Sequence, residues 1–151
     1  MKISEVLTPE LTICCAPGNS KKRVIEYLAS FMAAGQPELN ADGLYEQLLD
    51  RERLGSTGIG DGVAIPHCRS KEAKQVTAAM LKLGEAVNFD AIDDQPVDLV
   101  FALVVPDAQC DQHLQTLSSI ASVLMEESSR AALRASADSA QLYKTLIQLE
   151  H

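Results

Sequence analysis

The residue best suited to do chemistry is His67, which follows the apolar run Val63-Ala64-Ile65 and Pro66. The run predicts a short strand, and a proline at its end lacks an N–H and keeps the backbone extended. His67 is therefore expected to emerge at the carboxyl edge of a strand, where functional residues of open α/β sheets gather. A neutral imidazole is a competent nucleophile because its pKa lies near about 6.5.

Basic residues surround this histidine in the sequence. Between residues 51 and 71 four basic side chains outnumber two acidic ones, a net charge of +2 in a chain of net charge −8. A local positive field beside a histidine suits a bound anion such as phosphate. A phosphorylated imidazole would need a cation to hold the phosphoryl oxygens, which Arg51 or Arg53 could supply. The six residues are Arg51, Glu52, Arg53, Asp61, Arg69 and Lys71.

Three other residues could contribute to chemistry. His113 is expected at the start of a helix, where anions are attracted, although a solvated position in the first turn is an equal alternative. Cys110 lies three residues before His113, which permits a cysteine–histidine pair and hence a hydrolase. Cys68 adjoins His67, but neighbouring residues of an extended chain point to opposite faces, so these two form an awkward dyad.

The segment from Gly55 to Gly62 is rich in glycine and invites a nucleotide-binding interpretation, which its spacing does not support. Asp61 stands where a phosphate-binding P-loop requires lysine. Val63 stands where the dinucleotide fingerprint requires its third glycine. The segment is therefore expected to shape the floor of a pocket.

Hydrophobic periodicity predicts the elements that hold these residues in place. Apolar residues at helical spacing predict a helix that starts near Asn19 or Ser20 and stops before Pro37. The run over 97–105 is apolar on both faces, which predicts a central strand covered above and below. Further strands are expected over 11–15, 63–65 and 76–83, and helices over 41–51, from about Asp111, and twice more before the end. This pattern predicts a single α/β layered domain over residues 1–151.

Composition excludes several functions. The net charge of −8 and a pI near 4.8 disfavour nucleic acid and anionic lipid as partners. The longest apolar run, Leu99–Val105, is far short of a membrane span. The start of the chain has no apolar core typical of a secretory signal, so a cytoplasmic location is expected.

The four cysteines are Cys14, Cys15, Cys68 and Cys110. None forms a CxxC pair and no histidine stands at zinc-finger spacing from a cysteine pair, so a structural zinc site is not expected. No cofactor is expected either. Adjacent Cys14 and Cys15 should point to opposite faces of a strand. Reduced thiols are therefore preferred to a redox role.

The segment from Arg51 to His67, RERLGSTGIGDGVAIPH, resembles the active-site signature of the mannitol/fructose-class IIA components of the bacterial phosphoenolpyruvate-dependent phosphotransferase system. Within that class, Gly55–Gly60 followed by Phe89–Pro106 is most similar to the nitrogen-regulatory IIA branch. The resemblance covers nearly the whole chain. It implies a single-domain three-layer α/β/α sandwich with a mixed central sheet.

The resemblance also implies roles for particular residues. His67 would accept a phosphoryl group from a small histidine phosphocarrier protein, Arg51 would steady the phosphoryl oxygens, and His113 would be the second active-site histidine. Ser56 and Thr57 would be candidate hydroxyl donors. Cys68 stands where the family has glycine, so it is expected to crowd the donor or make the site oxidisable.

The sequence therefore predicts a phosphotransferase-system component that acts as a stoichiometric carrier and regulates partners according to its phosphorylation state. Regulated proteins of this kind include potassium-transport and sensor-kinase components. One alternative is a sugar-specific IIA protein that passes phosphate to a IIB domain. Another is an interaction module without transfer activity, and the last is a hydrolase that uses Cys110 and His113.

Overall fold

The computed structural model describes residues 2–107 and 110–150, and the side chains of all of these except residues 110–114. The helices are α1 (Ile3–Val6), the 3₁₀ turn η1 (Pro9–Leu11), α2 (Lys21–Gly35), α3 (Ala41–Leu54), α4 (Cys110–Leu124), α5 (Glu127–Arg134) and α6 (Ser139–Leu149). The strands are β1 (Thr12–Ala16), β2 (Gly58–Gly60), β3 (Val63–Ala64), β4 (His67–Ser70), β5 (Thr77–Val87) and β6 (Val97–Pro106). Among the described residues, no helix has the length and hydropathy to cross a membrane.

The strands of the described residues form one mixed sheet. Its order is β1-β5-β6-β3-β2, and β4 continues the β3 side of β6. Strand β6 runs parallel to β3 and β4 and antiparallel to β5, while β1 runs parallel to β5. Strand β6 therefore holds the sheet together, because β5 lies on one side of it and the two strands around His67 lie on the other.

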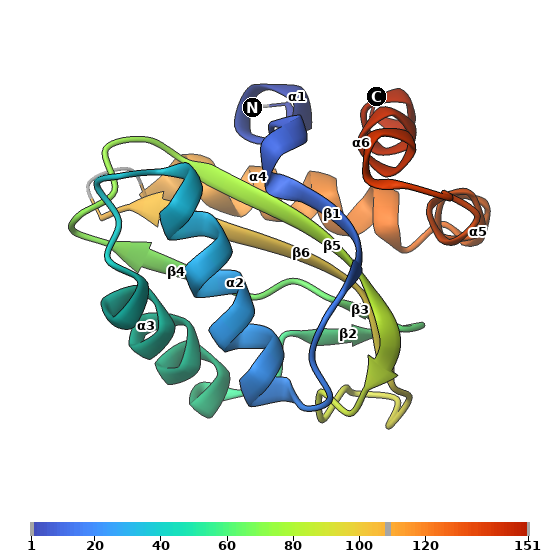
Figure 1. The fold of residues 1–151 in the computed structure, drawn as a ribbon, viewed down its shortest axis with the longest axis horizontal. Coiled ribbons are helices and arrows are strands. Elements are labelled where there is room, and N and C mark those ends of the chain that lie inside the picture. The colour runs from blue at the N-terminus through green and yellow to red at the C-terminus, as the bar shows by residue number, and fades with distance from the viewer. Residues whose placement is uncertain (1, 108–109, 151) are drawn as a thin grey trace.

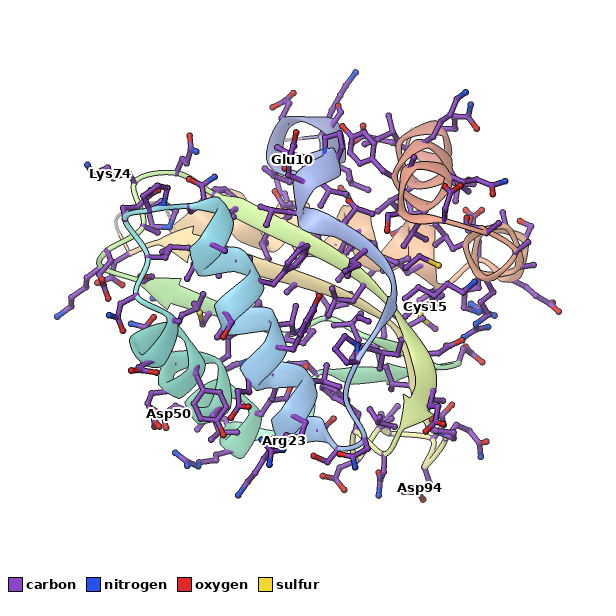
Figure 2. All side chains as sticks on the ribbon, viewed as in Figure 1. Glu10, Cys15, Arg23, Asp50, Lys74 and Asp94 are labelled. Carbon is purple, nitrogen blue, oxygen red and sulfur yellow. The ribbon has the colours of Figure 1, made fainter. Side chains whose placement is uncertain are left out.

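Helices cover both faces of the sheet, as Figure 1 shows. Helices α2 and α3 lie in front of it, whereas α4 crosses behind, with α5 and α6 at one end. Side chains fill the space between these layers, and labelled charged residues such as Asp50 and Lys74 lie at the periphery (Figure 2). The predicted three-layer α/β/α sandwich with a mixed central sheet is confirmed.

The core is centred on β6, as the apolar run predicts. Nine of its ten residues are buried, and the exception, Asp98, is half-buried. Leu99, Phe101 and Leu103 have no exposed surface and alternate in direction with equally buried Val100 and Ala102. Burial on both faces requires a covering layer on each side of the strand, and that requirement produces the sandwich.

The two helices in front of the sheet begin where the sequence places them. The Ser20 side chain accepts a hydrogen bond from the Arg23 N–H, and the Asn40 side chain accepts one from the Gly43 N–H. Each cap satisfies an N–H that the helix itself leaves free. Helix α3 continues to Leu54, three residues beyond the predicted end, and this extra turn brings Glu52 into the core.

Several elements differ from the sequence predictions. Strand β4 was not predicted, and His67 is its first residue instead of lying beyond the carboxyl end of a strand, because pairing with β6 resumes at His67. The glycine segment contains a short strand, β2, which joins β3 through a tight turn at Gly62, where φ is +81°. The strand expected over 76–83 extends to Val87. Helix α1 and the η1 turn were not predicted, because each is only about one turn long and shows no helical period.

The beginning and the end of the described chain are in contact. The Glu150 carboxylate accepts hydrogen bonds from the backbone N–H groups of Ile3 and Ser4, the latter over 3.4 Å. The Cys14 N–H of β1 donates to the Ser139 hydroxyl at the start of α6, over 2.9 Å. Helix α6, together with Glu150 at its end, is therefore hydrogen-bonded to α1 and to β1.

Candidate active site

His67 opens strand β4 directly after a break in the strand at Ile65 and Pro66. Across this break the Ile65 N–H donates to the Thr57 carbonyl, and the Pro66 carbonyl accepts from the Leu103 N–H. Pairing with β6 resumes at His67, opposite Leu103. The His67 side chain is half-buried, whereas Cys68 on the opposite face is buried. The imidazole therefore lies at the surface of the sheet and not in the interior.

Among the described side chains and backbone groups, one hydrogen bond orients the imidazole ring. His67 Nδ1 lies 2.8 Å from the Ile65 carbonyl oxygen. A carbonyl oxygen can only accept, so Nδ1 carries the hydrogen in this contact. In a neutral ring the other nitrogen, Nε2, then holds the free lone pair. The backbone thus favours the tautomer whose lone pair is on Nε2.

Arg51 lies in the last turn of α3, a helix that contacts β4, the strand that His67 opens. Its Nη1 donates to the Gly55 carbonyl over 2.9 Å, which holds the guanidinium at the end of the helix. Its positive charge lowers the pKa of His67, so the guanidinium acts on the ring electrostatically. Arg53, the other cation considered from the sequence, instead pairs with Asp50 over 2.5 Å. Of these two arginines, only Arg51 acts on the pKa of His67.

The pKa of His67 is lowered from its ordinary value. Burial is the largest cause, and Arg51 acts in the same direction. The hydrogen bond to Ile65 and the charge of Glu52 act the opposite way. Because the balance favours the uncharged ring, His67 is neutral and nucleophilic at neutral pH.

The buried carboxylate of Glu52 connects the elements around the site. Glu52 is 6% exposed and forms an ion pair of 2.7 Å with Lys21, the first residue of α2. It also accepts hydrogen bonds from the backbone N–H and the hydroxyl of Thr57. The Lys21 ammonium lies 5.5 Å from the centre of the Phe89 ring. Glu52 therefore joins α2, α3 and the loop that leads into β2.

The two hydroxyls predicted from the resemblance have partners within the protein. Thr57 donates its hydroxyl to Glu52. Ser56 donates to the Phe89 carbonyl over 2.6 Å and accepts the Gly58 N–H over 3.0 Å. Both residues hold the loop between α3 and β2, which also carries the Gly55 carbonyl that binds Arg51.

The side chains of Cys110 and His113 lie outside the described residues. Both residues belong to helix α4, which follows β6. The relation of the His113 ring to His67 therefore stays a prediction, as does the pairing of Cys110 with His113.

The prediction that Cys68 crowds or sensitises the site is wrong. Cys68 is buried within the core, on the face of β4 opposite to His67. Burial raises the pKa of its thiol to about 12, so at neutral pH it is protonated and inert.

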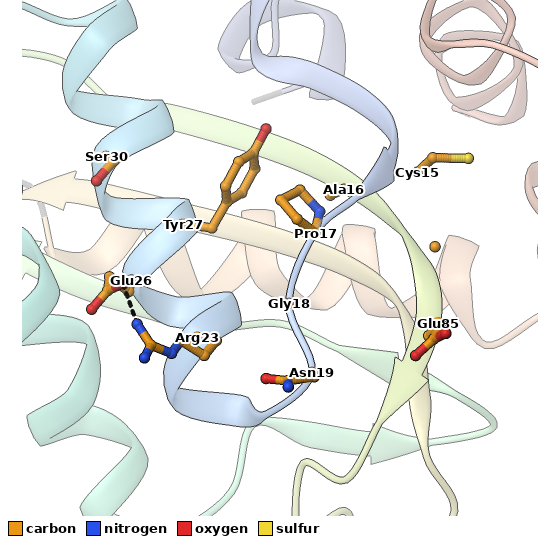
Figure 3. A pocket seen from close by; sticks show the side chains of 11 residues that line it. Cys15, Ala16, Pro17, Gly18, Asn19, Arg23, Glu26, Tyr27, Ser30 and Glu85 are labelled. Atoms are coloured by element: carbon orange, nitrogen blue, oxygen red, sulfur yellow. Dashed lines mark hydrogen bonds and ion pairs between the residues drawn. The ribbon is translucent and has the colours of Figure 1, made fainter.

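A cavity of about 680 Å³ lies away from these residues (Figure 3). The segment from Cys15 to Asn19, one side of α2, and Gly84 and Glu85 of β5 line it. Two of its three charged residues, Arg23 and Glu26, pair with each other over 3.2 Å. None of the predicted site residues lines this cavity.

Two residues of the site, Glu52 and Lys21, were not predicted as functional. A signal for Glu52 does exist in the sequence. Leu44, Leu48 and Glu52 recur every four residues, so the glutamate continues the buried stripe of α3. A carboxylate at a core position needs a partner. No comparable pattern identifies Lys21, because the contact depends on how α2 packs against α3.

The first prediction concerns the buried ion pair. Replacing Glu52 with glutamine removes the buried partner of Lys21 and leaves this ammonium only the exposed Asp90 carboxylate, 3.6 Å away. We therefore expect the free energy of unfolding to fall by about 3 kcal/mol. Chemical denaturation measures this change. Glu46→Gln, at an exposed position of the same helix, is the matched control and should change stability little. Equal effects of the two variants would contradict the role of Glu52.

The second prediction concerns the protonation of His67. Its pKa, measured by NMR titration of the ring, should lie below about 6.5. Arg51→Gln should raise that pKa and Arg53→Gln should leave it unchanged. Because the folded pKa is the lower one, the stability due to the neutral ring is complete above the unfolded value and declines as the pH falls below it. A ring that titrates above the unfolded value would contradict this assignment.

Comparison with known proteins places these residues in a family. The sequence pattern of the phosphoenolpyruvate-dependent sugar phosphotransferase system, EIIA 2, matches residues 5–149. A nitrogen regulatory protein of Pseudomonas aeruginosa is 40% identical over 151 residues, which cover 100% of this chain and 98% of that protein.

Solved structures agree with this match. The crystal structure of nitrogen regulatory protein IIA-Ntr from Neisseria meningitidis is 36% identical, with a TM-score of 0.89, and the match covers 95% of this chain and 98% of that one. IIA mannitol from Escherichia coli shares the fold at 22% identity, with a TM-score of 0.71 over 87% of this chain and 92% of that one. The chain thus belongs to the EIIA type 2 family of the phosphoenolpyruvate-dependent sugar phosphotransferase system.

Proposed function

We propose that this protein is a nitrogen-regulatory phosphocarrier that accepts a phosphoryl group on Nε2 of His67 from a small histidine phosphocarrier protein. The observation that carries the proposal is the 2.8 Å contact between Nδ1 and the Ile65 carbonyl, which leaves the lone pair of the neutral ring on Nε2. The charge of Arg51 also acts on this ring. The names of the Pseudomonas and Neisseria relatives favour nitrogen regulation over a sugar-specific role.

The transfer proceeds by attack of the Nε2 lone pair on phosphorus. The new Nε2–P bond forms as the P–N bond of the donor breaks, and the donor imidazole leaves with its electron pair. The ring becomes positively charged during attack, and the Ile65 carbonyl stabilises that charge through the Nδ1 hydrogen. The Arg51 guanidinium faces the negative charge of the incoming oxygens. His113 serves as a second histidine at the same site.

Phosphorylation is also the signal. It adds a charge of about −1.5 to −2 at pH 7 near a partly exposed guanidinium, so the electrostatic potential around His67 changes from positive to negative. Partner proteins that dock on this surface then distinguish the two states. We infer that the protein acts in the cytoplasm as a stoichiometric carrier. Its regulated partners are of the potassium-transport or sensor-kinase kind.

The third prediction tests the acceptor. With phosphoenolpyruvate and the phosphocarrier system, the wild-type protein should gain the mass of one phosphoryl group, and acid should remove it. His67→Ala should gain none because the nucleophile is absent. In ¹⁵N-labelled protein the phosphorus should couple to Nε2.

His151→Ala is the matched control for this experiment and should be labelled normally. An acid-labile phosphoryl group on His67→Ala would contradict the assignment. Coupling of phosphorus to Nδ1 would contradict the role of the Ile65 carbonyl.

The fourth prediction tests the cation. Arg51→Gln should slow phosphoryl transfer to His67 roughly 100-fold, the usual effect of removing one charge-stabilising donor. Arg53→Gln, two residues further along α3, should retain the wild-type rate because its guanidinium pairs with Asp50. Rapid-quench measurement of phosphoprotein gives the rates, and thermal unfolding checks that both variants fold. Equal slowing of both would contradict the selection of Arg51.

A further inference from the structure

Strand β1 contains an irregularity at its two cysteines. Cys14 lies opposite Lys82 of β5, whereas Ala16 lies opposite Leu83, so Cys15 is an extra residue without a partner in the pairing. Its φ of +65° places it in the left-handed region. This conformation is uncommon for a residue with a side chain, and it marks a bulge in the edge strand.

The bulge brings the two sulfur atoms together. In a regular strand, neighbouring side chains point to opposite faces, which is the arrangement predicted for this pair. That prediction is wrong, because Cys14 Sγ and Cys15 Sγ are 4.0 Å apart. Cys15 is exposed, and its side chain points away from Tyr27 and α2 (Figure 3).

A cation lies next to this pair. Cys14 Sγ donates to the Ser136 carbonyl over 3.8 Å, and Lys82 Nζ donates to the same carbonyl over 3.0 Å. Burial and the Cys15 thiol raise the pKa of Cys14, while Lys82 acts in the opposite direction. The exposed Cys15 thiol thus has a second thiol within 4.0 Å, the arrangement that intramolecular thiol–disulfide exchange uses.

We propose that Cys14 and Cys15 form a reactive dithiol site for small-molecule disulfides of the glutathione class, closing reversibly to a Cys14–Cys15 disulfide. The site lies at the β1 edge of the sheet, and β5 and β6 separate it from β4 and His67. It is therefore a second chemical site, independent of phosphoryl transfer.

The reaction takes two exchange steps. The Cys15 thiolate attacks one sulfur of the disulfide, which forms a mixed disulfide and releases one thiolate. Cys14 then attacks Cys15 Sγ and displaces the second thiolate. The two protons lost from the cysteines pass to the two released thiolates, so the protein is oxidised by two electrons and the small disulfide is reduced by two.

Strain makes this modification reversible. Adjacent Cα atoms are about 3.8 Å apart, which is shorter than the usual Cα separation across a disulfide. A strained disulfide is reduced more readily than a structural one. The site therefore opens again when the thiol form of the small molecule is in excess.

The fifth prediction tests this site. The folded, reduced protein is equilibrated with mixtures of glutathione and its disulfide, blocked with N-ethylmaleimide and analysed by mass spectrometry. In the expected product, Cys14 and Cys15 carry no maleimide. The tryptic peptide 3–21, whose only cysteines are these two, is then lighter by two hydrogens than the same peptide with free thiols. In denaturant the equilibrium constant should fall roughly tenfold, because the bulge no longer holds the sulfurs together.

Three variants serve as controls. Cys14→Ser should stop at a glutathione adduct on Cys15, Cys15→Ser should form no internal disulfide, and Cys68→Ser should close the ring normally. A lasting glutathione adduct on the wild-type protein, a disulfide between two copies, or no reaction would overturn the proposal. An equal equilibrium constant in denaturant would also overturn it, since the fold would then contribute nothing.

Discussion

The site depends on one buried charge pair, Glu52 with Lys21. Removing a carboxylate from water costs several kcal/mol, so a protein retains one in its core only with a partner and hydrogen bonds. Here Lys21 and both donors of Thr57 supply them. These bonds fix the end of α3 against the loop that follows it. The position of Arg51 is a consequence, since its own hydrogen bond is to Gly55 in that loop.

The break at Pro66 complements this arrangement from the side of the sheet. A continuous strand would pair all its backbone groups along the ladder, whereas the interruption leaves the Ile65 carbonyl available to the His67 ring. The same helix end gives the ring two opposite influences, a cation at Arg51 and an anion at Glu52. The ring is thus held in one tautomer and uncharged, the two conditions that a nitrogen nucleophile requires.

Strongly periodic segments could be predicted from the sequence, and contacts between distant segments could not. The run over β6 and the apolar stripes of α2 and α3 identified the core. Residue type and position pointed to His67, whereas charge left Arg51 and Arg53 open and only the family resemblance favoured Arg51. The strand order and the Lys21 contact arise only when helices pack on the sheet. The orientations of Cys14, Cys15 and Cys68 depend on a bulge and on which face of β4 is covered, neither of which leaves a periodic signal.

The contacts of α6 determine which elements unfold together. Glu150 bonds the first turn of α1, and Ser139 bonds Cys14 in β1, so elements from opposite ends of the sequence share their stability. Local unfolding proceeds in cooperative units that need not be contiguous along the chain. Detachment of α6 therefore removes contacts of α1 and exposes the β1 edge of the sheet in the same event. The part of the molecule around β4 and His67 remains folded.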